Sequence, residues 1–201
     1  MKFNIVHDVQ SVYRKLVDAI SRPGELASLQ RECLLVKGEN YLSDHQSVLL
    51  LALTMLDQEV TFKVLSEKEE IISKVIYQLT NAKPAQLEQA DYIFVLHDAE
   101  AGALEQAIHM AKEGTLYNPH LSASIIAETK SVSSGEEFLL KGPGIPESIV
   151  IATDLPRGWA KKRAAKNKEY PLGIDLFLID ADQQLLAIPR TAQMTEKQVM
   201  I

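Results

Sequence analysis

The order of apolar and polar residues along the chain predicts alternating helices and strands. Residues 8–20 place apolar side chains at three- and four-residue spacing, which gives a helix one apolar face. Residues 21–24 (Ser-Arg-Pro-Gly) predict its end, because a residue before proline avoids the helical region and glycine accepts a positive φ. The following 20 residues predict one or two strands with loops.

Two capping-box patterns predict the starts of two more helices. Residues 43–46 (Ser-Asp-His-Gln) precede a helix to about residue 56, and residues 66–69 (Ser-Glu-Lys-Glu) precede a helix to residue 80. The first of these helices is apolar nearly all round, which is typical of a helix buried between layers.

Two further helices are predicted in the second half of the chain. One covers residues 100–113 and is closed by Gly114, since glycine is the commonest residue just after a helix. Asp154 with Pro156 indicates the start of the other, because proline is tolerated in the first turn.

Short runs of β-branched and aromatic residues predict the strands. The strands alternate with the helices, which indicates an α/β layered fold with a mixed sheet. No linker rich in proline, glycine or serine divides the chain, so a single domain over residues 1–201 is predicted. The predicted strands are residues 60–65, 91–97, 122–128, 137–141 and 149–152, followed by a hairpin of 174–179 and 184–188 around a turn at 180–183.

Composition narrows the class of protein. The chain has 201 residues, of which 46% are apolar and 24% charged, as in an ordinary globular domain. Its 21 basic and 27 acidic side chains give a net charge of −6, which argues against general nucleic-acid binding. The lone cysteine, Cys33, excludes a disulfide framework and any CxxC-type metal site. No apolar leader follows the first residues, and the longest apolar run (48–56) is about half a membrane span, so a cytoplasmic protein is predicted.

Several standard catalytic motifs are absent from the sequence. There is no phosphate-binding loop and no G-x-S-x-G nucleophile turn, and residues 142–144 (Gly-Pro-Gly) lack the third glycine of a dinucleotide fingerprint. The five histidines are scattered, with no two at i and i+4. No metal site is therefore predicted.

His97 and Asp98 lie where a predicted strand ends, at a position with two interpretations. Ligands in open α/β sheets usually bind where strands end, which favours a functional role. The commoner role for such residues is to cap the next helix.

Two arginines lie in turns held by proline. Arg22 is in the 21–24 turn, and Arg190 follows Pro189 after the last predicted strand. A guanidinium fork suits phosphate or carboxylate oxygens, and a rigid turn holds it at low entropic cost. The alternative is an ordinary ion pair, for instance with Asp175, which stands in an otherwise apolar strand and must be paired, exposed or functional.

A basic segment lies between Arg157 and Lys168, with six bases and no acid. Such a helix on an acidic body could meet phosphate groups or an acidic partner subunit. The alternative is a solvated helix face. Trp159, if exposed, would indicate an interface.

The C-terminal part of the chain carries a resemblance to a known family. Residues 170–179 (Tyr-Pro-Leu-Gly-Ile-Asp-Leu-Phe-Leu-Ile) and then 186–191 (Leu-Ala-Ile-Pro-Arg-Thr) resemble the hallmark of the PhnH family, the H subunit of the bacterial carbon–phosphorus lyase core complex. The chain departs from the family at Ala192, where a second threonine is common, and its basic helix is richer in lysine than usual. The resemblance spans nearly the whole chain, since further segments agree in order: residues 13–16 with 21–24, the helix at 48–56, and residues 140–145.

The resemblance implies a three-layer α/β sandwich similar to the pyridoxal-phosphate-dependent transferase fold, without that cofactor. It implies an accessory subunit in phosphonate use that helps to form ribose 1-phosphonate 5-triphosphate from ATP and a phosphonate, displacing adenine. It also implies a homodimer, or assembly with the G, I and J subunits, and no activity alone. A pure scaffold subunit is the alternative, and a stand-alone transferase with a pyridoxal-like site is a third class that fold likeness alone supports poorly.

For this function, two arginines are the candidates to grip phosphorus oxygens of a phosphonate or nucleoside triphosphate. The glycines permit a close backbone approach, and the aspartate would orient an arginine or a ribose hydroxyl. No metal, cofactor, nucleic acid or membrane is expected. The candidate substrate-binding residues are Arg22, Gly24, Gly142, Gly144, Asp175, Arg190 and Thr191.

Overall fold

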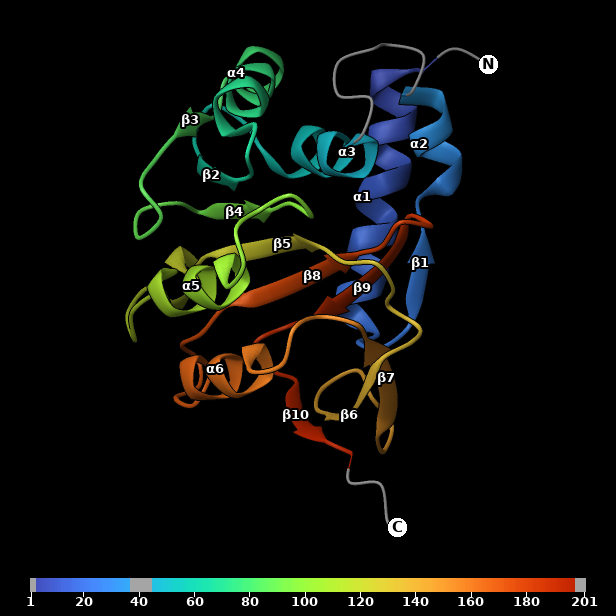
Figure 1. Ribbon diagram of the computed structural model, residues 1–201, viewed down its shortest axis with the longest axis vertical. Helices are drawn as coiled ribbons and strands as arrows, with labels where there is room; N and C mark the ends of the chain where they lie inside the picture. The colour runs from blue at the N-terminus through green and yellow to red at the C-terminus, as the bar shows by residue number, and fades with distance from the viewer. Residues whose placement is uncertain (1–2, 37–44, 198–201) are drawn as a thin grey trace.

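A mixed sheet of seven strands runs through the molecule, with the order β1-β9-β8-β5-β4-β2-β3 (Figure 1). The computed structural model describes residues 3–36 and 45–197. Strands β3, β2, β4, β5 and β8 pair in parallel, and β9 and β1 add antiparallel at one edge. The strands are β1 (Leu26–Ser28), β2 (Thr61–Leu65), β3 (Lys83–Pro84), β4 (Tyr92–Val95), β5 (Ser124–Glu128), β8 (Asp175–Ile179) and β9 (Gln184–Ile188).

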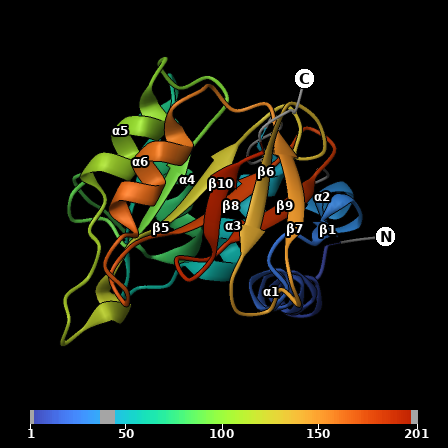
Figure 2. The same cartoon turned by 90° about the horizontal axis from the view of Figure 1, so that it is seen from below.

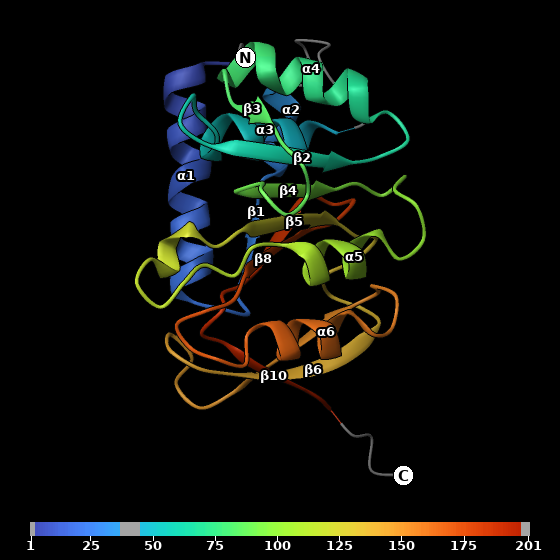
Figure 3. The same ribbon diagram turned by 90° about the vertical axis from the view of Figure 1, so that its left-hand side faces the viewer.

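Helices cover both faces of this sheet, as the sequence predicts. Figure 2 shows α5 and α6 on one side of the strands and α1 and α2 on the other. In Figure 3, α4 lies at the β2 end of the stacked strands, and α6 lies at the opposite end. The helices are α1 (Ile5–Ser21), α2 (Gln30–Val36), α3 (Gln46–Met55), α4 (Glu69–Thr80), α5 (Ala103–Met110) and α6 (Trp159–Lys166), with a short 3-10 turn at Pro119–Leu121.

Alternation along the strands divides the core in two. In β5, Ile125 and Ala127 pack toward α5 and α6, while Ile126 between them packs toward α1–α4. In the same way, Phe177 in β8 packs toward α1–α4, while its two neighbours in the strand pack toward α5 and α6. Successive side chains of a strand point to opposite faces, so strands buried on both faces become almost wholly apolar.

Three strands lie outside the main sheet. They form a small antiparallel sheet of order β10-β6-β7, next to α6 (Figure 2). The strands at 137–141 and 149–152 were expected in the sequence, but their place in a second sheet was not, because both alternate like any half-buried strand. Its strands are β6 (Glu136–Lys141), β7 (Ile149–Thr153) and β10 (Gln193–Glu196).

Helix starts are where the structure most often corrects the sequence. Helix α1 begins at Ile5, three residues before the predicted start, because the Asn4 side chain accepts hydrogen bonds from the backbone N–H groups of Val6 and His7. The predicted capping box at 66–69 does not form. Instead, Ser66 donates to Asp98 and α4 starts at Glu69.

The remaining helix starts also differ from the predicted ones. Residues 43 and 44 of the first predicted capping box lie outside the described residues, and α3 starts at Gln46 with His45 as its N-cap. The predicted start at Asp154 and Pro156 is replaced by Gly158, the N-cap of α6. Helix α2 was not predicted at all, since seven residues are too short for a clear helical period.

The basic segment at 157–168 is only partly a surface feature. Arg163 and Trp159 are fully buried, so neither contributes to an exposed basic patch or an interface. The side chains of Lys161 and Lys162 remain exposed. Among the described helices, none is both long and apolar enough to cross a membrane.

Candidate functional site

A pocket opens at the edge of the sheet where the parallel strands β4, β5 and β8 end. Its volume is about 590 Å³. Ligands of open α/β sheets bind outside the carboxyl ends of the strands, so this is the place where the fold favours a site. Its lining comes from the ends of these strands and the residues after them, from the residues after the strand at 149–153, and from the N-terminal turn of α3: Gln46, Ser47, His97, Glu128, Thr129, Lys130, Asp154, Leu155, Pro156, Ile179, Asp180, Ala181 and Gln183.

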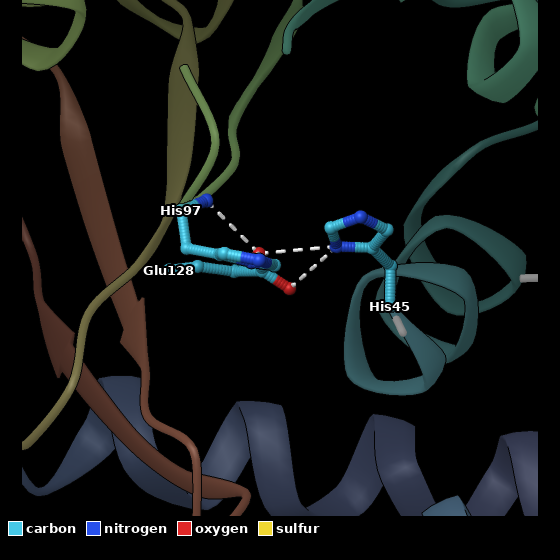
Figure 4. Close-up of side chains that lie close together, drawn as sticks. All are labelled: His45, His97 and Glu128. Carbon is cyan, nitrogen blue, oxygen red and sulfur yellow. Dashed lines mark hydrogen bonds and ion pairs between the residues drawn. The ribbon is translucent and has the colours of Figure 1, made fainter. Parts of the chain in front are cut away.

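A carboxylate that lines this pocket lies close to two imidazole rings (Figure 4). Glu128 is the last residue of β5, and its Oε2 lies 2.7 Å from Nδ1 of His97. Nδ1 of His45 lies 3.3 and 3.2 Å from the two oxygens of the same carboxylate. The two rings are themselves close, with centroids 5.0 Å apart.

The three side chains differ in their access to solvent. His45 is 4% exposed and Glu128 is 11% exposed, whereas His97 is 59% exposed. Burial alone would raise the pKa of Glu128, but hydrogen bonds from His45 and His97 outweigh burial and hold that pKa below its ordinary value. Glu128 is therefore ionised at neutral pH and ready to bind a cation or accept hydrogen bonds.

His97 and Asp98 do not cap the next helix, so the capping interpretation is wrong. The N-cap of α5 is Gly102. The backbone N–H of His97 donates to Oε2 of Glu128 at 3.1 Å, while Asp98 accepts from Ser66. His97, after the end of β4, is instead one of the residues that line the pocket.

Two more carboxylates shape the opposite side of the pocket by tying down its loops. Oδ1 of Asp154 accepts hydrogen bonds from the Thr129 hydroxyl and from the backbone N–H groups of Lys130 and Ser131. Asp180 accepts from backbone N–H groups of residues 132, 182 and 184. Because their oxygens are engaged within the protein, these aspartates are positioned and cannot swing freely.

The charge of the pocket is negative. Among the described residues that line it, three are carboxylates and Lys130 is the one lysine or arginine. Such a surface attracts cations and hydroxyl groups, and it repels free phosphate oxygens. Imidazole nitrogens beside a carboxylate oxygen can also hold a metal ion, and the ligand atoms of His45, His97 and Glu128 all lie within 4.8 Å of one another.

The sequence did not predict this cluster. His45 and Glu128 are 83 residues apart, and no two histidines have helical ligand spacing. The available signal was positional, since His97 and the predicted strand at 122–128 both indicated side chains at the carboxyl edge. His45 carried no such signal, because it reaches the Glu128 carboxylate from the start of α3.

The residues expected to bind substrate lie at the opposite edge of the sheet. Asp175 begins β8, and β8 runs toward the pocket, so Asp175 and Arg190 lie at the amino edge. Arg190 donates to Asp175 through Nε at 3.3 Å and Nη2 at 2.5 Å, and to the Pro119 carbonyl at 2.8 Å. Arg190 therefore forms the ordinary ion pair with Asp175 that the sequence offered as the alternative to ligand binding.

The other expected residues gather in three neighbouring loops. Arg22 is 55% exposed and lies 3.3 Å from Asp18 and 3.5 Å from Glu25. It lines a cavity of about 350 Å³ together with Gly144. Close backbone contacts join Gly144 to the 21–24 turn and Gly142 to Thr191, while Gly24 lies against Ile149. The structure thus brings these residues to one side, away from the carboxyl-edge pocket.

Gly144 cannot accept a side chain without strain, which predicts a measurable loss of stability. It has a φ of +82°, and a Cβ there would lie 2.2 Å from the Ser21 carbonyl oxygen. Gly144→Ala is expected to lower the free energy of unfolding by about 2 kcal/mol or more, as left-handed strain and a backbone clash combine. Urea denaturation followed by circular dichroism measures this loss in the free energy of unfolding.

Gly102 provides the matched control. Its φ of +86° is nearly the same, yet a Cβ there meets nothing within 4 Å. Gly102→Ala should therefore cost only the conformational strain, about 1 kcal/mol. Equal losses for the two variants would contradict the close packing of the 142–144 loop on the 21–24 turn.

Comparisons with known proteins place this fold in a family. The family model described as bacterial phosphonate metabolism protein (PhnH) matches residues 3–195. A relative from Stutzerimonas stutzeri, named putative C-P lyase subunit protein HtxG, is 26% identical over 189 residues, covering 94% of this chain and 86% of the relative. The PhnH subunit of alpha-D-ribose 1-methylphosphonate 5-triphosphate synthase from Rhizobium meliloti (strain 1021) is 26% identical over 190 residues, covering 94% of this chain and 91% of the relative. The chain belongs to the PhnH family of bacterial phosphonate metabolism proteins.

Proposed function

We propose that the protein is an accessory subunit of a carbon–phosphorus lyase system in organic phosphonate catabolism. Its role is to help form a ribose 1-phosphonate 5-triphosphate from ATP and a phosphonate, with release of adenine. The family match over residues 3–195 carries this proposal. The names of both relatives, a C-P lyase subunit and a synthase subunit, support it.

The subunit acts within a complex and not alone. The two relatives are named as subunits, which supports protein partners for this chain as well. We place the G, I and J subunits of the core complex, or a second copy of this chain, as those partners. This proposal also includes a likeness to the pyridoxal-phosphate-dependent transferase fold, the lack of that cofactor and a cytoplasmic location.

Substrate contact at the amino edge is the part of the proposal that needs a direct test. Arg22 supports it, because its guanidinium is largely exposed beside a cavity. Arg190 supports the alternative, a scaffold subunit without substrate contact, because its fork is engaged by Asp175 and the Pro119 carbonyl. The packed loops would belong to the surface in both cases, whether it binds substrate or only a partner subunit. Their residues are Gly24, Gly142, Gly144 and Thr191.

Reconstitution of the complex with ATP and methylphosphonate tests the role as a whole. Product formation and adenine release are expected with this chain together with its G, I, J and L companions. No product is expected from the chain alone or from the companions without it. A complete reaction by the isolated chain, or an unchanged rate in its absence, would refute the accessory role.

Arg22→Ala in the reconstituted complex separates substrate contact from scaffolding. A charged hydrogen bond to a phosphorus oxygen contributes about 1.5–3 kcal/mol, so its loss should slow the reaction about 10- to 100-fold while assembly stays intact. Arg14→Ala, at an exposed position on α1, is the control and should leave the rate unchanged. An unchanged rate for Arg22→Ala, or a loss of assembly, would favour the scaffold.

A further inference from the structure

We propose that His45, His97 and Glu128 bind a divalent transition-metal ion of the zinc class in the wall of the carboxyl-edge pocket. This site goes beyond the phosphonate role, because it rests on side chains at the opposite edge of the sheet from the residues expected to bind substrate. Neither its ligands nor its test depends on the reaction in which the subunit takes part.

The distances between the ligand atoms fit a shared ion. Zinc binds imidazole nitrogens at about 2.0–2.1 Å and carboxylate oxygens at about 2.0–2.2 Å, so tetrahedral ligand atoms lie roughly 3.4 Å apart. The Nδ1 atoms of His97 and His45 lie 2.7 Å and 3.2 Å from Oε2 of Glu128, and all three ligand atoms lie within 4.8 Å. The separation of His97 Nδ1 from Oε2 of Glu128 would widen by about 0.7 Å to admit an ion among the three atoms.

The three ligands stand on rigid supports. Glu128 ends β5, which is paired on both sides by β4 and β8. His97 lies two residues after the end of β4, and its backbone N–H is fixed by the Glu128 carboxylate. His45 is buried at the start of α3. Since helix and strand ends hold the ligands, little entropy is lost when an ion binds.

The chemistry of the donors selects the class of ion. Two imidazoles and one carboxylate form a typical three-ligand set for zinc, whereas Mg²⁺ prefers oxygen ligands only. The part of the pocket lining that the structure describes adds the carboxylates of Asp154 and Asp180 against one lysine, Lys130, so its field attracts a divalent cation. A bound cation would also offset the charge that now repels phosphorus oxygens from the pocket.

The geometry leaves room for a further ligand. His97 and Glu128 both line the pocket, and His97 is the exposed member of the three. An ion held by three protein ligands therefore keeps a coordination position toward the pocket, as in metal sites that bind water or a substrate oxygen. The competing explanation is a metal-free cluster in which both rings donate Nδ1–H groups to the Glu128 carboxylate.

Titration of the metal-stripped full chain with Co²⁺ and Zn²⁺ distinguishes the two explanations. Co²⁺ should produce visible absorption bands that saturate at one equivalent, and Zn²⁺ should abolish them while excess Mg²⁺ does not. His97→Ala and Glu128→Gln should each weaken Zn²⁺ binding more than about 100-fold, since loss of a ligand exceeds the effect of outer partners. Calorimetry gives the affinities.

Controls keep the result specific to this cluster. His97 is largely exposed, so His97→Ala is expected to fold, and circular dichroism verifies this. The test therefore still stands if Glu128→Gln fails to fold. His109→Ala removes an exposed histidine of α5, on the opposite face of the sheet from α3, and should bind Zn²⁺ as the wild type does. No saturable binding, or equal binding by the wild type and His97→Ala, would overturn the metal site and leave the hydrogen-bonded cluster.

Discussion

Replacing Arg163 by alanine is expected to lower the free energy of unfolding by about 4 kcal/mol. Arg163 is 1% exposed, and its guanidinium donates to the backbone carbonyls of Ile188, Pro189 and Ala192 at 3.2, 2.7 and 3.2 Å. The variant leaves these carbonyls without their charged donor and opens a cavity beneath α6. Urea denaturation measures the loss, which is a large fraction of a typical stability of about 5–15 kcal/mol.

The size of this effect depends on a balance between burial and hydrogen bonding. Burial lowers the pKa of Arg163 to about 10, and the negative charge of Asp175 opposes that shift. The arginine remains charged at neutral pH, so the cost of its burial is already part of the native state. Alanine removes that cost together with the hydrogen bonds. The unpaired carbonyls and the cavity are expected to outweigh the relief, since each unpaired group costs about 1–3 kcal/mol.

Lys161→Ala is the control for Arg163→Ala. Lys161 lies on the same helix and is exposed, so its replacement should change the stability by no more than about 0.5 kcal/mol. A similarly small loss for Arg163→Ala would show that the guanidinium is not what fixes α6 to the segment after β9.

The elements that the sequence predicted correctly are those with a strong period. The closing hairpin has the predicted strand at 184–188, and the first strand begins one residue after the predicted start, at Asp175. The apolar helix α3 is buried, as its lack of a polar face indicated. In these segments the hydrophobic pattern and the local turn residues favour the same structure, so little tertiary information was needed.

The elements that the sequence missed or placed only broadly are short or depend on distant pairing. Strand β1 lies within the 20 residues predicted to hold one or two strands with loops, but its position there was not predicted. Strand β1 has three residues and exists because it pairs with β9, which follows more than 150 residues later. Strand β10 pairs with β6, which lies more than 50 residues earlier in the chain. Neither segment contains enough residues to show a period, and tertiary contacts decide its conformation.

The candidate site was predictable only in outline. The sequence indicated His97 and Asp98 at the end of β4, but it did not single out Glu128 at the end of β5 and could not show that α3 brings His45 to the same point. Ser66 and Asp154 were expected to start helices, because their side chains suit an N-cap. In the structure they bind other loops instead, Ser66 to Asp98 and Asp154 to Thr129.

Asp175→Asn is expected to lower the free energy of unfolding by about 2–3 kcal/mol. Asp175 and Arg190 are each 18% exposed, so the loss should fall somewhat below the 3–5 kcal/mol typical of a fully buried pair that loses one partner. Oδ1 of Asp175 also accepts the backbone N–H of Arg190 at 2.7 Å, which fixes the turn after β9. Chemical denaturation of the single variants and of the double variant Asp175→Asn/Arg190→Ala gives the coupling energy.

The coupling energy distinguishes two roles for Arg190, an ion pair with Asp175 and binding of phosphorus oxygens of the substrate. If the arginine serves the ion pair, the double variant should lose less stability than the sum of the single variants, by about 1 kcal/mol or more. Asp175→Asn should then cost more than Arg190→Ala, because Asp175 also opposes the pKa shift of the buried Arg163. Strict additivity, with Arg190→Ala slowing the reconstituted reaction at unchanged stability, would instead assign the Arg190 guanidinium to phosphorus oxygens of the substrate.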